Sequence, residues 1–185
     1  MSIALSKVDV ITNQANIFKS AKEWAIPTLV GKMDILKTFM EMYEKEFGEI
    51  YETLPQQIIH RDPNPGNIIL CGDKWGIIDF DISERNIRIF DPCYAATAIL
   101  SESFEDGNTN KLNQWIEVYK NILQGYVEVV KLSDNEWKAI PYVIITNQLI
   151  ATAWFSEQEK YRELYETNKK MTEWMLYNYD SMLFE

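Results

Sequence analysis

Three side chains of this sequence stand out by their type and spacing: Asp62, Asn67 and Asp79. Asp62 and Asn67 lie in the polar run 60–67, which has the pattern H-R-D-x-x-x-x-N, and Asp79 ends an apolar run just before Phe80. A hydroxyl that attacks a phosphate needs a carboxylate within hydrogen-bond reach to orient it and take its proton. Magnesium prefers hard oxygen ligands such as amide and carboxylate groups. The sequence therefore predicts Asp62 as the catalytic residue of phosphoryl transfer, with Asn67 and Asp79 as metal ligands.

Two short β-branched runs must position these side chains. Residues 68–71 and 75–78 are separated by Gly72-Asp73-Lys74, a sequence typical of a tight turn. A hairpin of these two runs would bring Asn67 and Asp79 to neighbouring positions, although they are well separated in the chain. We therefore expect a small β element beside the catalytic loop.

Apolar residues recur at helical spacing through the first fifty residues. The first stripe should end at Pro27, and the second should follow Gly31, with Asp34 in its first turn and Gly48 loosening its far end. Such stripes are far more often core than cofactor sites, so we assign them to packing. Their members are Ile17, Phe18, Ala21, Trp24 and Ala25, and then Ile35, Leu36, Phe39, Met40, Tyr43 and Phe47.

The region after the hairpin should begin with a short strand at 86–89. Asp91 followed by Pro92 is typical of a helix start, with the aspartate as the N-cap and the proline in the first turn. That helix should stop near Ser103. Capping explains Asp91 fully, whereas Asp81 either supports the metal site or is a solvated turn residue.

Further helices are expected in the second half of the chain. Apolar spacing predicts a long amphipathic helix over 112–130. Ser133 with Glu136 forms a capping-box pattern, and Pro141 should break the chain that follows into a short helix and a longer one. A last helix is expected over 161–182.

Composition and charge limit the classes of partner. The chain of 185 residues carries a net charge of −10, whereas nucleic-acid binding needs clustered Lys and Arg. Met1–Val10 lacks the basic start and long apolar run of a signal peptide, and no segment reaches the length of a membrane span. Cys71 and Cys93 give no disulfide framework and should be small buried hydrophobes. We expect a cytoplasmic protein that binds neither nucleic acid nor membrane.

Residues 58–81 resemble the catalytic core of the aminoglycoside phosphotransferase and choline kinase superfamily, which are small-molecule kinases with a protein-kinase-like fold. The resemblance implies that Asp62 is the catalytic aspartate and that Asn67 and Asp79 bind Mg²⁺. His60 would match a position that mainly shapes the loop. ATP would be the phosphoryl donor.

The resemblance also implies a fold: an α+β, mainly helical chain that corresponds to the C-terminal lobe of a protein-kinase-like fold. The chain 1–185 would be a single such lobe, with the catalytic loop and metal hairpin at 58–81 and a helical subdomain at 91–185. A weaker likeness to homoserine-kinase-like members covers residues 125–141. The β-rich N-lobe of such kinases carries a phosphate-covering loop and a strand-borne lysine. We expect this N-lobe to be absent, since neither pattern precedes the catalytic loop.

Three functions fit these observations. The first is an ATP-dependent phosphotransferase for a small-molecule hydroxyl, of amino alcohol or aminoglycoside type, completed by a separate N-lobe partner or within a homo-oligomer. The others are a binding module that keeps the acceptor pocket and a truncated chain without activity. For a cationic acceptor, Trp154 and Phe155 offer an aromatic wall. Nearby carboxylates could line the same pocket or simply mark solvated helix ends: Glu102, Glu105, Asp106, Glu157 and Glu159.

Overall fold

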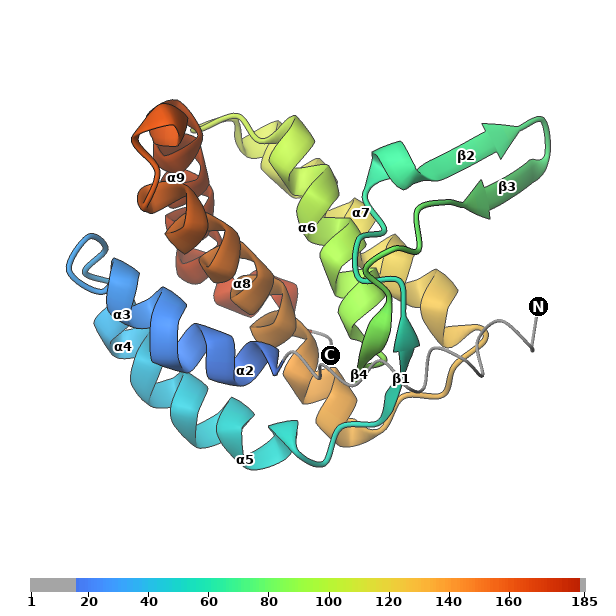
Figure 1. Ribbon diagram of the computed structural model, residues 1–185, viewed down its shortest axis with the longest axis horizontal. Coiled ribbons are helices and arrows are strands. Elements are labelled where there is room, and N and C mark those ends of the chain that lie inside the picture. The colour runs from blue at the N-terminus through green and yellow to red at the C-terminus, as the bar shows by residue number, and fades with distance from the viewer. Residues whose placement is uncertain (1–15, 184–185) are drawn as a thin grey trace.

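Helices make up most of the computed structural model, which describes residues 16–183 (Figure 1). Two small antiparallel sheets accompany them, so the prediction of a mainly helical α+β chain is confirmed. Among the described residues, every helix is too short or too polar to span a bilayer. The expectation about Met1–Val10 concerns residues outside the described range.

The first helical stripe continues past the proline expected to end it. Helix α2 (Ile17–Ser20), the π-helical turn η1 (Ala21–Ala25) and helix α3 (Ile26–Leu29) follow one another without a break. Pro27 lies in the first turn of α3, directly after the π-helical turn has changed the hydrogen-bond register. A missing N–H group costs little at such a position. The prediction of a helix end at Pro27 is therefore wrong.

The second stripe also forms one continuous helical stretch. It consists of α4 (Leu36–Met42), the π-helical turn η2 (Tyr43–Phe47) and α5 (Gly48–Tyr51). Gly48 does not loosen this stretch but allows a close approach, because a Cβ atom there would lie 3.0 Å from Cζ of Phe18. Stacked and edge-on rings fill the junction: Phe18, Tyr43, Phe47, Tyr51 and Tyr142.

The strands form two separate antiparallel pairs. Strand β1 (Gln56–Ile59) pairs with β4 (Glu84–Ile87), and β2 (Ile68–Cys71) pairs with β3 (Lys74–Ile77). The predicted hairpin is thus confirmed, with its second strand one residue earlier and its turn at Gly72-Asp73. Strand β4 begins two residues before the expected position.

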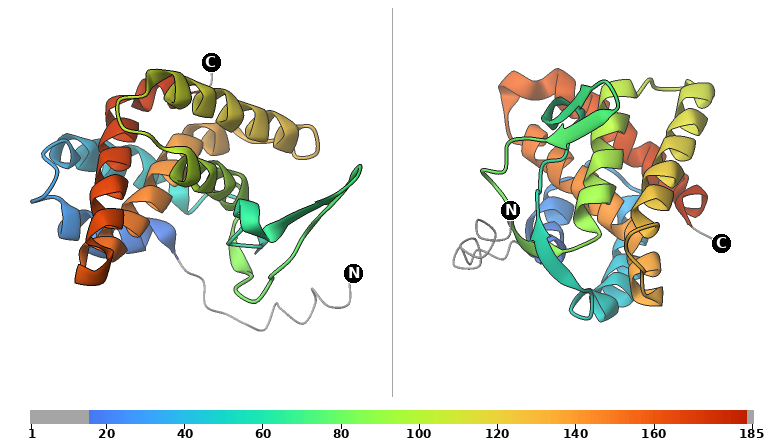
Figure 2. Two further views of the ribbon diagram at one scale, coloured as in Figure 1. Left: turned by 90° about the horizontal axis from the view of Figure 1, so that it is seen from above. Right: turned by 90° about the vertical axis from the view of Figure 1, so that its right-hand side faces the viewer.

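The β2–β3 hairpin projects away from the helical body in every view (Figures 1 and 2). Large apolar side chains on it are exposed, with Leu70 76% and Trp75 70% accessible. Cys71 is exposed for the same reason, since no second layer covers the hairpin within the described chain. The prediction of a buried residue is therefore wrong for Cys71 and confirmed for Cys93.

Four long helices complete the chain: α6 (Phe90–Ser103), α7 (Thr109–Val127), α8 (Asp134–Ser156) and α9 (Arg162–Tyr177). Short 3-10 turns precede and follow α9, at Glu159–Tyr161 and Tyr179–Met182. Helix α8 contacts α6, α9 and the N-terminal helical segments, so it is the centre of the core.

Helix α8 passes through Pro141 without ending there. The prediction of two helices at this point is wrong, because α8 runs unbroken from residue 134 to 156 with the proline inside it. All side chains from Ala139 to Leu149 are buried. Packing on every side of this stretch outweighs the loss of one backbone hydrogen bond.

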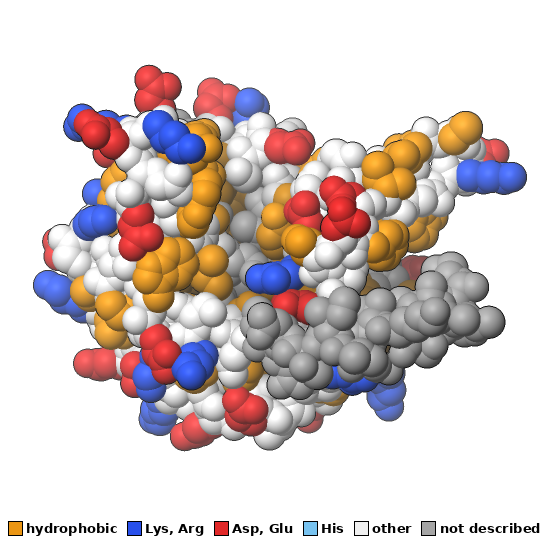
Figure 3. All heavy atoms as spheres, viewed as in Figure 1, with side chains coloured by type: hydrophobic (Ala, Val, Ile, Leu, Met, Phe, Trp, Pro, Cys, Tyr) orange, Lys and Arg blue, Asp and Glu red, His pale blue; other side chains and the backbone are white. Residues whose placement is uncertain are grey.

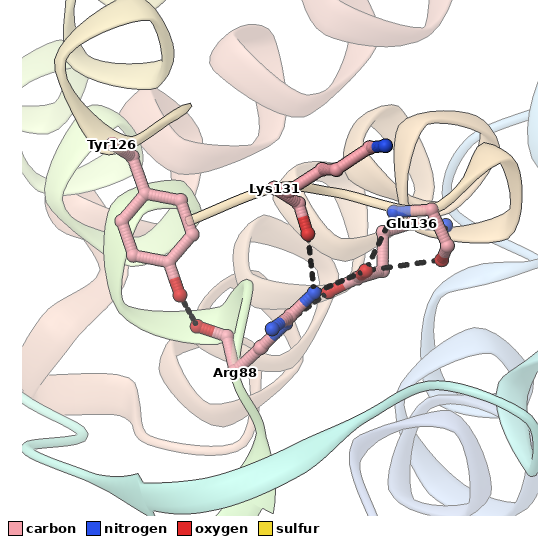
Figure 4. Close-up of polar contacts among 5 residues, drawn as sticks. Arg88, Tyr126, Lys131 and Glu136 are labelled. Atoms are coloured by element: carbon pink, nitrogen blue, oxygen red, sulfur yellow. Dashed lines mark hydrogen bonds and ion pairs between the residues drawn. The ribbon is translucent and has the colours of Figure 1, made fainter. Parts of the chain in front are cut away.

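A buried ion pair ties the end of β4 to the start of α8 (Figure 4). Arg88 donates from Nε and Nη2 to the two carboxylate oxygens of Glu136 at 2.6 and 2.7 Å, and to the Lys131 carbonyl at 2.9 Å. Glu136 also accepts the Ser133 N–H at 2.9 Å, which completes the predicted capping box. Burial acts to raise the pKa of Glu136, but the hydrogen bonds from Arg88 and Ser133 outweigh it, so that this pKa lies below its ordinary value.

Candidate active site

Asp91 fixes the backbone at the start of the catalytic loop. Its Oδ2 accepts the His60 N–H at 2.8 Å and its Oδ1 accepts the Arg61 N–H at 2.9 Å. The interpretation of Asp91 as a helix cap is wrong, because Ile89 occupies the N-cap position and Asp91 lies inside the first turn of α6. Burial raises the pKa of Asp91 above its ordinary value, although the two N–H groups act in the opposite direction.

His60 links the catalytic loop to the chain after β3. Its Nε2 donates to the Ile78 carbonyl at 2.7 Å, and its Nδ1 accepts the Asp62 N–H at 3.2 Å. The ring packs edge-on against Phe80, with 4.5 Å between the centroids. These contacts require a neutral imidazole with its proton on Nε2. The prediction that His60 shapes the loop is confirmed.

The Asp62 carboxylate is held by two amide side chains of its own loop. Its Oδ1 accepts from Asn64 Nδ2 at 2.9 Å, and its Oδ2 accepts from Asn67 Nδ2 at 3.2 Å. On the helical side lies Tyr94 of α6; burial first, and then its hydrogen bond to Asp62, raise the pKa of Tyr94 to about 12. Asp62 is therefore fixed in orientation while remaining half-buried.

Asn67 and Asp79 flank the open end of the β2–β3 hairpin. The Ile78 N–H bonds to the Asn67 carbonyl at 3.0 Å, next to the Ile68–Ile77 pair that opens the ladder. Asp79 follows directly, exposed and with a left-handed φ of 65°. The backbone thus brings the two residues close together, while their role as a metal pair stays a prediction.

The donor set of Asn67 and Asp79 fits a magnesium ion. Asn67 Nδ2 already donates to Asp62, which leaves its side-chain oxygen free for a cation. Asp79 accepts no hydrogen bond from any described residue. Residues 16–183 hold no cluster of three or more His, Cys, Asp or Glu side chains suited to a metal, but Mg²⁺ usually takes only one or two protein oxygens and completes its shell with phosphates and water. Asp81 lies exposed in the following turn, in agreement with the solvated reading.

A groove of about 600 Å³ opens beside Asp62, between the catalytic loop, the N-terminal helical segment, α6 and α8. Figure 3 shows this face hollowed between the helical body and the hairpin, with hydrophobic side chains along both sides. Arg61 lines it from the loop, its guanidinium 3.3 Å from Glu84, and Asn147 lines it from α8. The larger wall residues are aromatic: Trp24, Phe90, Tyr94, Trp154 and Phe155.

The acidic residues expected near the aromatic wall are only partly there. Glu105 and Asp106 pair with surface lysines at 2.7 and 2.8 Å and border a separate shallow hollow formed by 105–110. Their assignment to the acceptor pocket is therefore wrong. Glu157 does approach the groove, since it accepts the indole N–H of the wall residue Trp24 at 3.1 Å.

Sequence reasoning missed Trp24, Tyr94 and Asn147 as groove residues. The helical period of Trp24 and Tyr94 indicates packing, and it does not show which part of a buried stripe borders a cavity. Asn147 carries a clearer signal, because it is an amide in the middle of the fully buried stretch 139–149. A polar side chain at such a position needs a partner.

The comparisons with known proteins agree with this geometry. The model of a family described as "Phosphotransferase enzyme family" matches residues 27–126, more than half of the chain. The chain belongs to this family, and the resemblance to the aminoglycoside phosphotransferase and choline kinase superfamily is confirmed. Searches of curated proteins and of solved structures gave no match.

Proposed function

We propose that this chain is the catalytic helical part of an ATP-dependent phosphotransferase that acts on a hydroxyl of a small molecule. Asp62 would orient and deprotonate that hydroxyl, while Asn67 and Asp79 would bind the Mg²⁺ that accompanies ATP. One observation carries the proposal: the Asp62 carboxylate, held by Asn64 and Asn67, borders both the groove and the end of the hairpin.

The residues of the loop divide the work in a simple way. A hydroxyl group in the groove would donate to the Asp62 carboxylate and pass its proton there as its oxygen forms a bond to the γ-phosphorus, while the bond from that phosphorus to the ADP oxygen breaks. Asn64 and Asn67 keep the carboxylate aimed, so that little reorganisation is needed. Magnesium bound by Asn67 and Asp79 would neutralise phosphate charge.

The nucleotide needs a further binding surface. Within residues 16–183, the strands form only the two small sheets, and neither is a β-rich lobe that could cover the phosphates. The exposed apolar hairpin supports a surface supplied from outside these residues, either by a separate N-lobe polypeptide or by a second copy of the chain.

A second candidate function is ligand binding without turnover. The groove is lined without Asn67 or Asp79, so it can hold a small molecule even if no metal binds. Saturable binding in the groove with no transfer from ATP, under conditions in which Mg²⁺ and ATP are both bound, would favour this alternative.

The test is transfer by the intact chain at high concentration, followed by ³¹P NMR. The reactions contain Mg-ATP and a panel of amino alcohols, aminoglycosides and neutral alcohols. We expect slow formation of a phosphate ester that Asp62→Asn lowers by about 10²–10⁴-fold, because the general base is lost. Asp81→Asn is the matched control and should retain the wild-type rate, since Asp81 is an exposed turn residue. Equal rates for wild type and Asp62→Asn would refute the proposed role.

A further inference from the structure

Asn147 is a buried amide in the wall of the groove with an unused donor. The residue is 9% exposed, and its Nδ2 has no hydrogen-bond partner among the described residues. A buried N–H group without a partner costs free energy, because it has given up water and gained nothing in exchange. Such groups are rare in native proteins, and each calls for a specific explanation.

The two polar neighbours of Asn147 on α8 are satisfied inside the protein. Thr146 shares a hydrogen bond of 2.9 Å with the Tyr43 hydroxyl, and Gln148 Nε2 donates to Asn168 Oδ1 at 3.0 Å. These partners come from the helices that cover other faces of α8. Asn147 borders the groove instead, so its partner has to come from a molecule in the groove.

The surroundings of Asn147 define what that molecule looks like. Phe90, Ile150 and Phe155 present apolar surface, which favours an aliphatic or aromatic body. Asp62 is an acceptor and suits the hydroxyl that is to be phosphorylated. Asn147 Nδ2 is a donor, so it requires an oxygen that accepts a hydrogen bond.

We propose that Asn147 selects the molecule in the groove by donating a hydrogen bond from Nδ2 to one of its oxygens. This molecule has an apolar or aromatic body and, besides the hydroxyl at Asp62, a carbonyl, ether or hydroxyl oxygen at Asn147. In the ligand-free chain Nδ2 is shielded, and rotation of the amide about its soft χ2 torsion turns it toward the groove. The inference rests on the proposed function only in taking the groove as the acceptor site.

Acetophenone and ethylbenzene are suitable probes, because they have similar size and shape and only acetophenone carries a carbonyl. Neither has a hydroxyl, so binding is measured independently of phosphoryl transfer. The intact ¹⁵N-labelled chain is titrated with each, and the indole N–H signals of Trp24 and Trp154 report occupancy of the groove. We expect acetophenone to bind about tenfold more tightly. The side-chain amide signals of Asn147 should shift with acetophenone only.

Asn147→Leu keeps the shape of the side chain and removes the donor. It should bind the two probes equally and should unfold at a higher temperature than wild type, because the unpaired amide is gone. Asn135→Leu removes an exposed amide elsewhere on α8 and should keep the tenfold preference.

Three results would overturn the inference: a wild type that does not distinguish the probes, an Asn147→Leu variant that keeps the preference, or indole signals that neither probe moves at millimolar concentration. If the variant does not fold, the wild-type Asn147 amide signals decide, and the absence of a shift with acetophenone overturns the inference. A confirmed preference together with no Asp62-dependent transfer would refute the proposed function alone.

Discussion

Arg61 and Asp79 hold left-handed backbone conformations, with φ of 76° and 65°, that residues other than glycine rarely adopt. Each costs about 1–3 kcal/mol unless the surrounding structure enforces it. Asp91 binds the N–H of Arg61, and His60 binds the carbonyl that precedes Asp79. These two side chains therefore stabilise both strained positions of the candidate site.

Asp91→Ala should destabilise the chain by about 2 kcal/mol, because two backbone N–H groups of the catalytic loop lose a charged partner. Burial of the carboxylate, which raises the pKa of Asp91, offsets part of what these bonds contribute. Urea unfolding measures the change. Asp81→Ala, which removes an exposed carboxylate, should stay within about 0.5 kcal/mol of wild type. Equal effects of the two substitutions would contradict the role given to Asp91.

At the residue scale, the sequence predicts what is local. The pattern H-R-D-x-x-x-x-N places Asp62 and Asn67 on one loop, and the structure has them joined by hydrogen bonds. The partners of Asp91 lie 30 and 31 positions away in the chain. Its position before Pro92 indicates a helix cap, and only tertiary structure shows that its carboxylate turns toward another segment.

At the element scale, amphipathic periods and turn chemistry predict most helices and the hairpin, because both signals are local. Pro27 and Pro141 are the exceptions, since both lie inside helical stretches. The first is accommodated by a neighbouring π-helical turn and the second by burial on all sides of α8. Neither compensation is visible in the residues next to the proline.

Glu136→Gln should destabilise the fold by about 3–5 kcal/mol, because Arg88 then faces a neutral amide in a partly buried position. The pKa of Glu136 in the folded chain lies below its ordinary value of 4.5. Its stabilising contribution is therefore fully present above pH 4.5 and is lost as the pH falls through the folded-state pKa.

The measurement is urea unfolding of wild type and variant across that pH range. The difference in unfolding free energy should be largest near neutral pH and should shrink on acidification. Glu128→Gln, at an exposed position, is the control and should change stability by less than about 0.5 kcal/mol at any pH. A difference for Glu136→Gln that does not vary with pH would contradict this account.

The hairpin allows a matching test of its exposed surface. Leu70 and Trp75 are directly opposite each other in the ladder. Replacing them together, Leu70→Lys with Trp75→Glu, should leave stability nearly unchanged, because an opposite-charge pair preserves the strand pairing. Self-association or partner binding, measured by sedimentation equilibrium, should weaken. Val129→Lys, at an exposed apolar site outside the hairpin, should not weaken it.

At the scale of the whole molecule, Asp62 lies where two unlike parts meet. The groove is built by helices of one continuous core, whereas the hairpin that leads to Asn67 and Asp79 stands clear of that core (Figure 2). Binding of the small molecule depends on the first part alone. Binding of the nucleotide depends on what covers the second.

We therefore expect the isolated chain to bind ATP weakly and to turn over far more slowly than the 1–100 s⁻¹ typical of kinases. An uncovered nucleotide lacks most of the contacts that position its phosphates. Calorimetry with Mg-ATP and a steady-state assay of ADP release check this. Rapid turnover by the isolated chain, abolished in Asp62→Asn, would mean that the described residues suffice for catalysis.

The isolated position of the β2–β3 hairpin gives it a further use as a reporter. A two-stranded ribbon on its own is marginally stable, and the outward-facing amides of both strands meet only water. Their protons should exchange with deuterium within seconds in the free chain, while those of the central part of α8 persist far longer. A surface that packs against the ribbon would slow exchange over residues 68–77 and leave α8 unchanged. Mass spectrometry of deuterium uptake in a cell extract can thus detect the missing covering surface before its identity is known.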